Sequence, residues 1–145
     1  EQFKAAIAEI APELAVNVET WSVEGKSLAE LENDAKARVR ARKPDIVVIA
    51  VRRSAAAANP EAYAKSYAWI MNWSLNFGPP TWDCFVVHPT VADKNPGEHD
   101  ALVRRLVKAQ DLPLVDRPTG SEEASKAVLT NWLRARYNER KRDAK

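Results

Sequence analysis

The sequence has few of the residues on which several classes of protein depend. A single cysteine, Cys84, excludes an internal disulfide in this chain of 145 residues. Only four glycines are present, and they form neither a phosphate-binding loop nor a dinucleotide-binding fingerprint. The two histidines, His88 and His99, do not have the spacing of zinc ligands. We therefore expect neither a metal nor a cofactor.

Charge and hydropathy exclude two kinds of partner. The net charge of +2 is too small to indicate nucleic acid by itself, and the basic residues near the C-terminus fit a solvated helix end. No apolar run approaches the length of a membrane span, and no signal-peptide pattern opens the chain. A hydrophobic content of 46% is typical of a soluble globular protein, so residues 1–145 are expected to form one domain. Neither the compartment nor the oligomeric state is indicated.

The most informative stretch is the apolar run of residues 46–51 (IVVIAV). It is rich in β-branched side chains and shows no polar alternation, which predicts a strand buried on both faces of a parallel sheet. In such sheets ligands gather at the carboxyl ends of the strands. The residues that follow this run, Arg52, Arg53 and Ser54, are therefore the first candidates for a site.

Further strands and helices are predicted on both sides of this run. Residues 14–22 alternate between apolar and polar side chains, which predicts a half-exposed strand near a sheet edge, and residues 82–87 and 112–116 predict two more strands. Helical spacing and capping signals predict helices that end near Pro12, begin at Ser27, Asn59 and Asn95, and begin near Ser121. Strand–helix alternation predicts an α/β fold, with a four-stranded parallel sheet between two helical layers.

In this order the segments resemble the SGNH (GDSL-type) hydrolase superfamily. The likeness rests on a strand, the Gly25 loop and a helix, followed by the apolar strand, a strand that leads into Pro89, and Leu-Pro-Leu-Val-Asp at residues 112–116. It covers nearly the whole chain. The resemblance implies a three-layer, flavodoxin-like fold and acyl transfer on esters, with a Ser nucleophile, a Gly and an Asn that hold the oxyanion, and an Asp-x-x-His.

The signature residues of that family match this chain only in part. The Ser block would precede Glu1, and because the first helix has no strand before it, we expect a strand upstream. The oxyanion Gly matches Gly25 in Val-Glu-Gly-Lys-Ser, and Ser54 stands where the family has its Asn. No Asp-x-x-His follows the last strand, where the chain reads Asp-Arg-Pro-Thr-Gly-Ser from Asp116.

Each candidate residue fits two roles. Gly25 fits either an oxyanion donor or a turn that needs positive φ, and Ser54 fits either an oxyanion donor or a cap. His88 fits either a general base at a strand end or a ring held by backbone groups before a turn. Arg52 and Arg53 fit a clamp for a carboxylate, phosphate or sulfate, but they also fit a pair of surface arginines or partners for Asp and Glu in neighbouring loops.

Two hypotheses follow for function. The leading one is an SGNH-type esterase or deacetylase that acts on a small-molecule ester or an acylated carbohydrate. In this hypothesis Gly25, Ser54 and His88 belong to the catalytic site, and this chain alone is inactive because its nucleophile lies upstream of Glu1. The alternative is a non-catalytic flavodoxin-like domain that binds an anionic ligand or partner through Arg52 and Arg53. The missing Asn and Asp-x-x-His favour the alternative.

Overall fold

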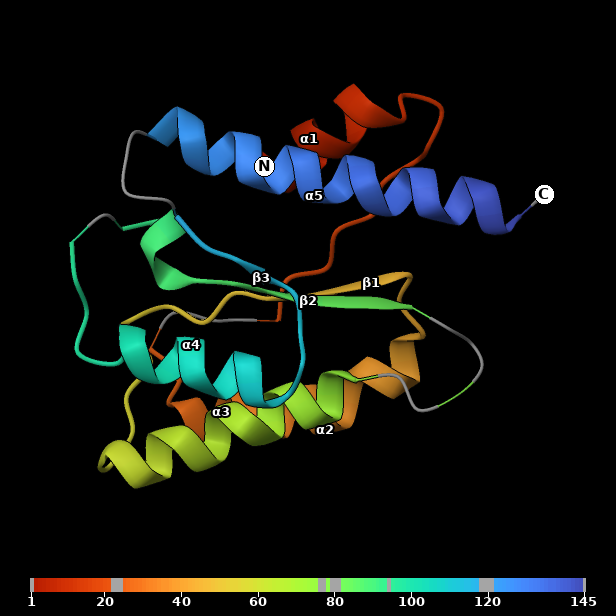
Figure 1. Cartoon of the computed structure of the whole chain (residues 1–145). Helices are drawn as coiled ribbons and strands as arrows, with labels where there is room; N and C mark the ends of the chain where they lie inside the picture. The colour runs from red at the N-terminus through yellow and green to blue at the C-terminus, as the bar shows by residue number, and fades with distance from the viewer. Residues whose placement is uncertain are drawn as a thin grey trace. The chain divides into compact units, whose positions relative to one another are not determined.

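The computed structural model describes residues 2–21, 25–75, 78, 82–93, 95–117 and 122–144. Contacts divide the chain into two compact units, a larger one (residues 21–114) and a smaller one (residues 1–20 and 115–145), which are described separately. The elements are, in order (Figure 1), α1 (Gln2–Ile10), α2 (Leu28–Arg42), β1 (Ile46–Ile49), α3 (Pro60–Ser74), β2 (Asp83–Val87), the 3₁₀ turn η1 (Pro89–Val91), α4 (Asp100–Ala109), β3 (Leu114–Val115) and α5 (Glu122–Asp143).

The parallel pairing of strands in the sheet confirms the α/β class. Its strand order is β1-β2-β3, and β1 pairs with β2 in parallel, from Ile46 opposite Asp83 to Ile49 opposite Val86. On the other side of β2, the Val86 N–H donates to the Pro113 carbonyl over 2.9 Å. The division between the two units falls inside β3.

The core of the larger unit lies between one face of the sheet and three helices. Figure 1 shows α2, α3 and α4 on the same side of β1 and β2. On this face Val47, Ile49 and Val86 join a cluster of buried residues. The helices contribute Leu28, Ala35 and Val39 from α2, Tyr63, Tyr67, Ile70 and Met71 from α3, and Val103 and Val107 from α4.

Burial on both faces, expected for residues 46–51, is wrong at Val48, whose exposed fraction is 38%. Side chains alternate between the two faces of a strand, so Val48 points away from the face that the three helices of this unit cover. β1 also ends at Ile49, two residues before the apolar run does.

The strand expected at residues 14–22 is also wrong as far as the structure describes it. Residues 14–21 have no strand pairing, and Ser22 lies outside the described residues. Leu14 and Val18 are each 50% exposed. Alternation shows that a segment suits a half-buried strand, but a strand forms only where a neighbour accepts its backbone hydrogen bonds. The described sheet therefore has three strands rather than four.

Capping signals predicted two helix starts correctly and one incorrectly. Ser27 and Glu30 form the expected capping box before α2, and Asn59 caps α3 with Pro60 at its first position. The helix expected after Asn95 begins instead at Asp100, with His99 as its N-cap. Asn95 donates its backbone N–H to the Asp93 carboxylate over 3.0 Å, so this Asn-Pro pair belongs to a loop.

The smaller unit contains α1 and α5, which pack against each other. Arg134 Nη2 and Glu9 Oε1 lie 3.3 Å apart, and the Tyr137 hydroxyl donates to the Glu13 carboxylate. This hydrogen bond, with help from Lys141, lowers the pKa of Glu13. In the described part of the chain no helix is both long enough and apolar enough to cross a membrane.

Candidate functional site

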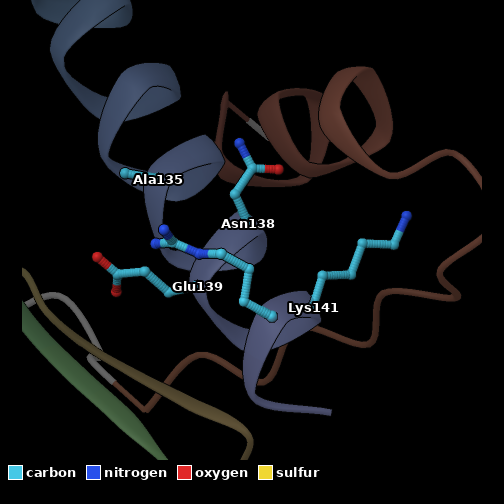
Figure 2. Close-up of a pocket in the computed structure, with 5 residues that line it drawn as sticks. Ala135, Asn138, Glu139 and Lys141 are labelled. Atoms are coloured by element: carbon cyan, nitrogen blue, oxygen red, sulfur yellow. The ribbon is translucent and has the colours of Figure 1, made fainter. Parts of the chain in front are cut away.

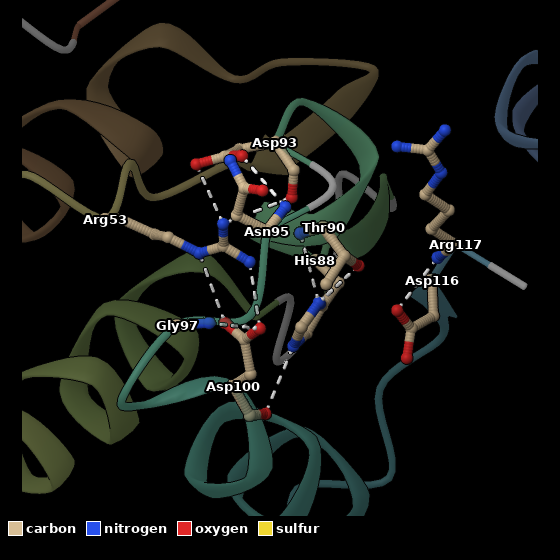
Figure 3. A network of polar contacts seen from close by, with 9 residues as sticks. All are labelled: Arg53, His88, Thr90, Asp93, Asn95, Gly97, Asp100, Asp116 and Arg117. Carbon is tan, nitrogen blue, oxygen red and sulfur yellow. Dashed lines mark hydrogen bonds and ion pairs between the residues drawn. The ribbon is translucent and has the colours of Figure 1, made fainter. Parts of the chain in front are cut away.

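The loops that follow β1 and β2 bring together one polar cluster, which Figure 3 shows and which we call the Arg53 network. It consists of Arg53 from the loop after β1 and of His88, Thr90, Asp93, Gly97 and Asp100, which follow β2. All six residues belong to the larger unit. Two of them, Arg53 and His88, were expected at a site from the sequence.

Arg53 uses its whole guanidinium group inside this network. Its Nε and Nη2 donate to the two carboxylate oxygens of Asp100 over 3.3 and 2.8 Å. Its Nη1 donates to the Asp93 backbone carbonyl over 3.1 Å and lies 2.9 Å from the Asp93 carboxylate. Side-on pairing of this kind matches the planar fork of arginine to a carboxylate. Two carboxylates thus meet one positive charge, which disfavours Arg53 as a site for a further anion.

Because Gly97 has no side chain, the Arg53–Asp100 pair can occupy the space beside its Cα atom. A Cβ atom at this position would lie 2.5 Å from Arg53 Nε and 2.8 Å from Asp100 Oδ1, closer than such atoms can approach. The Gly97 N–H donates to Asp100 Oδ2 over 2.9 Å. The sequence did not indicate this role, because the helix expected to begin at Asn95 placed Gly97 in its first turn.

The network keeps its carboxylates ionised. Desolvation alone would raise the pKa of Asp100, but the Gly97 N–H and the Arg53 guanidinium outweigh it, so that this pKa lies below its usual value. The pKa of Asp93 is also lowered, mainly by the hydrogen bond from the Asn95 backbone N–H and also by Arg53. Asp100 is the first residue of α4, and Asp93 lies in the segment before it.

His88 is fully buried, and both of its ring nitrogens have partners. Nε2 lies 3.1 Å from the Asp100 carbonyl oxygen, which can only accept, so Nε2 carries a proton and donates it. Nδ1 accepts the Thr90 backbone N–H over 3.3 Å and lies 2.7 Å from the Thr90 hydroxyl. A general base must reach a proton of the substrate, and this ring instead joins two backbone segments.

The remaining candidates lie at the surface of the larger unit. Arg52 and Ser54 are exposed in a turn that the Ala55 N–H closes onto the Arg52 carbonyl over 3.0 Å. Gly25 is exposed and has φ of +88°, which explains the glycine by backbone conformation. In the part of the chain that the structure describes, no hydrogen bond connects Gly25 with the Arg53 network.

A concave feature lies on α5 in the smaller unit (Figure 2). It is a shallow hollow, open to solvent, and its lining residues all come from this one helix: Ala135, Asn138, Glu139, Lys141 and Arg142. A ligand site usually buries most of its ligand between several elements. Because this hollow lacks such walls and contains none of the expected residues, it does not support a site.

Among the described residues, no group of three or more His, Cys, Asp or Glu side chains is placed to hold a metal ion. Comparison of the chain with known protein families, curated proteins and solved structures found no match.

Proposed function

We propose that this chain is a non-catalytic α/β domain that binds an anionic ligand or partner at the carboxyl edge of its sheet. The observation that carries the proposal is that both ring nitrogens of His88 have hydrogen-bond partners within the chain. The histidine at the strand end therefore stabilises the loops around it. An anion-binding role for this edge needs only donors, and no general base.

Within this proposal Arg52 makes the contact with the anion. Successive residues that leave a strand point to opposite sides, and Arg53 points into the network with Asp93 and Asp100. Arg52 is exposed next to it. An anion would have to compete with the interactions that Arg52 already makes in the chain. For this reason we expect weak binding of a simple anion and tighter binding of a partner with several carboxylates or phosphates.

Titration with inorganic phosphate and with a short poly-glutamate peptide, followed by calorimetry or NMR shifts, tests the proposal. Arg52→Ala should weaken binding by about tenfold or more, because hydrogen bonds to charged groups contribute about 1.5–3 kcal/mol. Arg53→Lys is the matched control, since it changes the neighbouring arginine and keeps the positive charge. Binding that survives Arg52→Ala unchanged, or that never occurs, would refute the assignment.

An activity assay separates this proposal from catalysis by the chain itself. The chain should hydrolyse p-nitrophenyl acetate no faster than a heat-denatured sample. Turnover that disappears in Ser54→Ala or His88→Ala would show that these residues are catalytic and would overturn the non-catalytic proposal.

A second candidate is an SGNH-type hydrolase acting on a small-molecule ester or an acylated carbohydrate. The parallel strand order β1-β2-β3, with Ser54 and His88 following β1 and β2, favours it. Its finer architecture, a three-layer flavodoxin-like sheet of at least four strands, belongs to this hypothesis. The nucleophile would then come from sequence beyond this chain. An apolar strand followed by Gly-Asp-Ser in the upstream coding sequence, and esterase activity in the extended protein, would favour this candidate over the binding domain.

A further inference from the structure

The two carboxylates of the Arg53 network are held in different ways. Asp100 binds the guanidinium group side-on and also accepts the Gly97 N–H, and its side chain is only 11% exposed. The Asp93 carboxylate lies 2.9 Å from Arg53 Nη1, and its side chain is 51% exposed. Ion pairs at the surface contribute little to stability. Of the two carboxylates, that of Asp93 is therefore the one that can leave Arg53 at low cost.

The Asp93 side chain can leave without any movement of its backbone. The Asp93 N–H donates to the Pro89 carbonyl over 3.0 Å, and the Asp93 carbonyl accepts a hydrogen bond from Arg53 Nη1 over 3.1 Å. Neither of these bonds involves the carboxylate. A rotation about χ1 is therefore enough to move the carboxylate into solvent, while Asp100 continues to hold Arg53 in place.

Two donors meet at the position that the Asp93 carboxylate occupies (Figure 3). Arg53 Nη1 lies 2.9 Å from Oδ2, and the Asn95 N–H donates to Oδ1 over 3.0 Å. Hydrogen bonds from a guanidinium group and from a backbone N–H are among the strong contacts that a carboxylate makes. Because Asp100 fixes the arginine, this donor stays in position once the Asp93 carboxylate has left. A donor that is already in place loses little free energy through ordering when an anion binds.

We propose that Asp93 covers a binding site for a carboxylate side chain of an acidic partner protein, and that the partner displaces the Asp93 carboxylate from it. The group that fills the site in this structure is itself a carboxylate, so the two donors already have the spacing that such a group needs. The displaced side chain moves into solvent, where salt screens its charge. The inference adds a second site, at Arg53 and Asn95, and rests on the proposed function only for the anionic class of partner.

The internal carboxylate makes the site selective. Asp93 belongs to the chain and competes at every partner concentration, so the apparent affinity falls with the fraction of molecules in which the site is free. A single anion in solution has only one contact with which to compete. A partner with several carboxylates gains from each contact that it makes at the same time. Asp93 therefore favours acidic partners over isolated anions.

Titration of the full chain with a short poly-glutamate peptide, followed through the NMR signals of the Arg53 side-chain N–H groups and the Asn95 backbone N–H, tests the proposal. Asp93→Ala removes the internal carboxylate. The peptide should then move both signals and bind about fivefold more tightly than it binds the wild type, which is the bias that an exposed ion pair can impose. Glu98→Ala is the matched control, because Glu98 is an exposed acidic residue near Asp93 that makes no ion pair with Arg53. It should change the affinity much less.

Circular dichroism decides whether Asp93→Ala still folds. If it does not, Asp93→Asn keeps the shape of the side chain and removes the charge that pairs with Arg53, and it should likewise tighten binding. A folded Asp93 variant that binds the peptide no more tightly than the wild type would overturn the proposal. An equal gain in Glu98→Ala would also overturn it, because the gain would then come from net charge alone. So would peptide binding that leaves the Arg53 and Asn95 signals unmoved.

Arg52→Ala separates this site from the contact proposed at Arg52. In the Asp93→Ala background it should leave the peptide-induced shifts of Arg53 and Asn95 in place. If Arg52→Ala does not weaken binding to the wild type while Asp93→Ala tightens it, the contact at Arg52 is wrong and the site at Arg53 stands. If Arg52→Ala weakens binding while Asp93→Ala has no effect, the proposed function stands and this inference fails.

Discussion

The side chains of Arg53 and Asp100, 47 residues apart in the sequence, join the loop after β1 to the start of α4. Two hydrogen bonds, over 2.8 and 3.3 Å, hold the chain after β1 against the first residue of α4. The backbone carbonyl of the same Asp100 accepts the hydrogen bond from His88. One residue thus connects the ends of β1 and β2 with α4, and the geometry of the carboxyl edge depends on it.

Arg53→Ala should lower the free energy of unfolding by about 1–3 kcal/mol, because Asp100 would remain largely buried without its cation. The Asp93 pair lies at the surface and should add little. Chemical denaturation of Arg53→Ala, Asp100→Ala and the double variant measures the coupling between the two residues. Strictly additive effects would mean that the pair contributes nothing beyond its separate side chains.

Gly97→Ala should destabilise the protein by displacing the Arg53–Asp100 pair, since the new methyl group would meet Arg53 Nε at 2.5 Å. The loss should be smaller in an Arg53→Ala background, where part of the clash is absent. Thermal denaturation of the four variants of this cycle measures the difference.

Gly25→Ala is the control for this glycine. It meets no atom within 4 Å but has φ of +88°, so it should cost about 1 kcal/mol through backbone strain. Because that strain is independent of Arg53, the cost should be the same in both backgrounds. An equal loss for Gly97→Ala in both backgrounds would show that the pair is not what the glycine accommodates.

Local signals in the sequence were sufficient for the helix starts that depend on neighbouring residues. The capping box of Ser27 and Glu30, and Asn59 before Pro60, satisfy free amide groups three residues away. The prediction of a strand at residues 14–22 failed for the opposite reason. Their alternation is local, whereas a strand needs a partner that is distant in the sequence, and the described sheet offers them none.

The candidate site was only partly predictable for the same reason. The carboxyl-edge rule directed attention to Arg53 and His88, which the structure brings into one network, because the rule needs only the strand ends. It could not show that Asp100 would pair with Arg53 and accept a hydrogen bond from His88, since these contacts join residues that are far apart in the sequence. Asp100 is the first residue of α4, where the helix dipole also favours a negative charge. Acidic residues early in a helix can also form ion pairs with arginines from other loops.

Acid should weaken the protein partly through Asp100. Its pKa in the folded state is lowered, so the unfolded chain binds a proton first as the pH falls. The stabilisation is therefore complete above the unfolded pKa, near 4, and is lost as the pH falls through the folded value. Denaturation between pH 6 and pH 2 measures this dependence. Asp100→Asn cannot titrate, so its stability deficit relative to the wild type should shrink toward low pH, and a constant deficit would contradict the assignment.

The hydroxyl group of Tyr67 is buried without a hydrogen-bond partner among the described residues. A buried polar group of this kind costs about 1–3 kcal/mol of desolvation that no bond offsets. Tyr67→Phe removes the oxygen and keeps the ring that packs in the core. It should therefore leave stability unchanged or raise it by about 1 kcal/mol, unlike most substitutions of a fully buried residue.

Alkaline titration adds a readout specific to this hydroxyl. Burial, with a smaller contribution from Tyr63, raises the pKa of Tyr67 far above its ordinary value. A tyrosine with a raised folded pKa contributes stability below its unfolded pKa, near 10, and that stability falls as the pH rises further. Tyr67→Phe should lose less stability than the wild type between pH 9 and pH 11.5.

Tyr63→Phe is the matched control for the Tyr67 variant. Tyr63 stacks on Tyr67 with ring centroids 5.9 Å apart, but its hydroxyl is not among the buried groups without a partner. It should gain no stability at neutral pH. A clear loss of stability in Tyr67→Phe at neutral pH would mean that the hydroxyl has a partner, such as a buried water, whose hydrogen bond outweighs its desolvation.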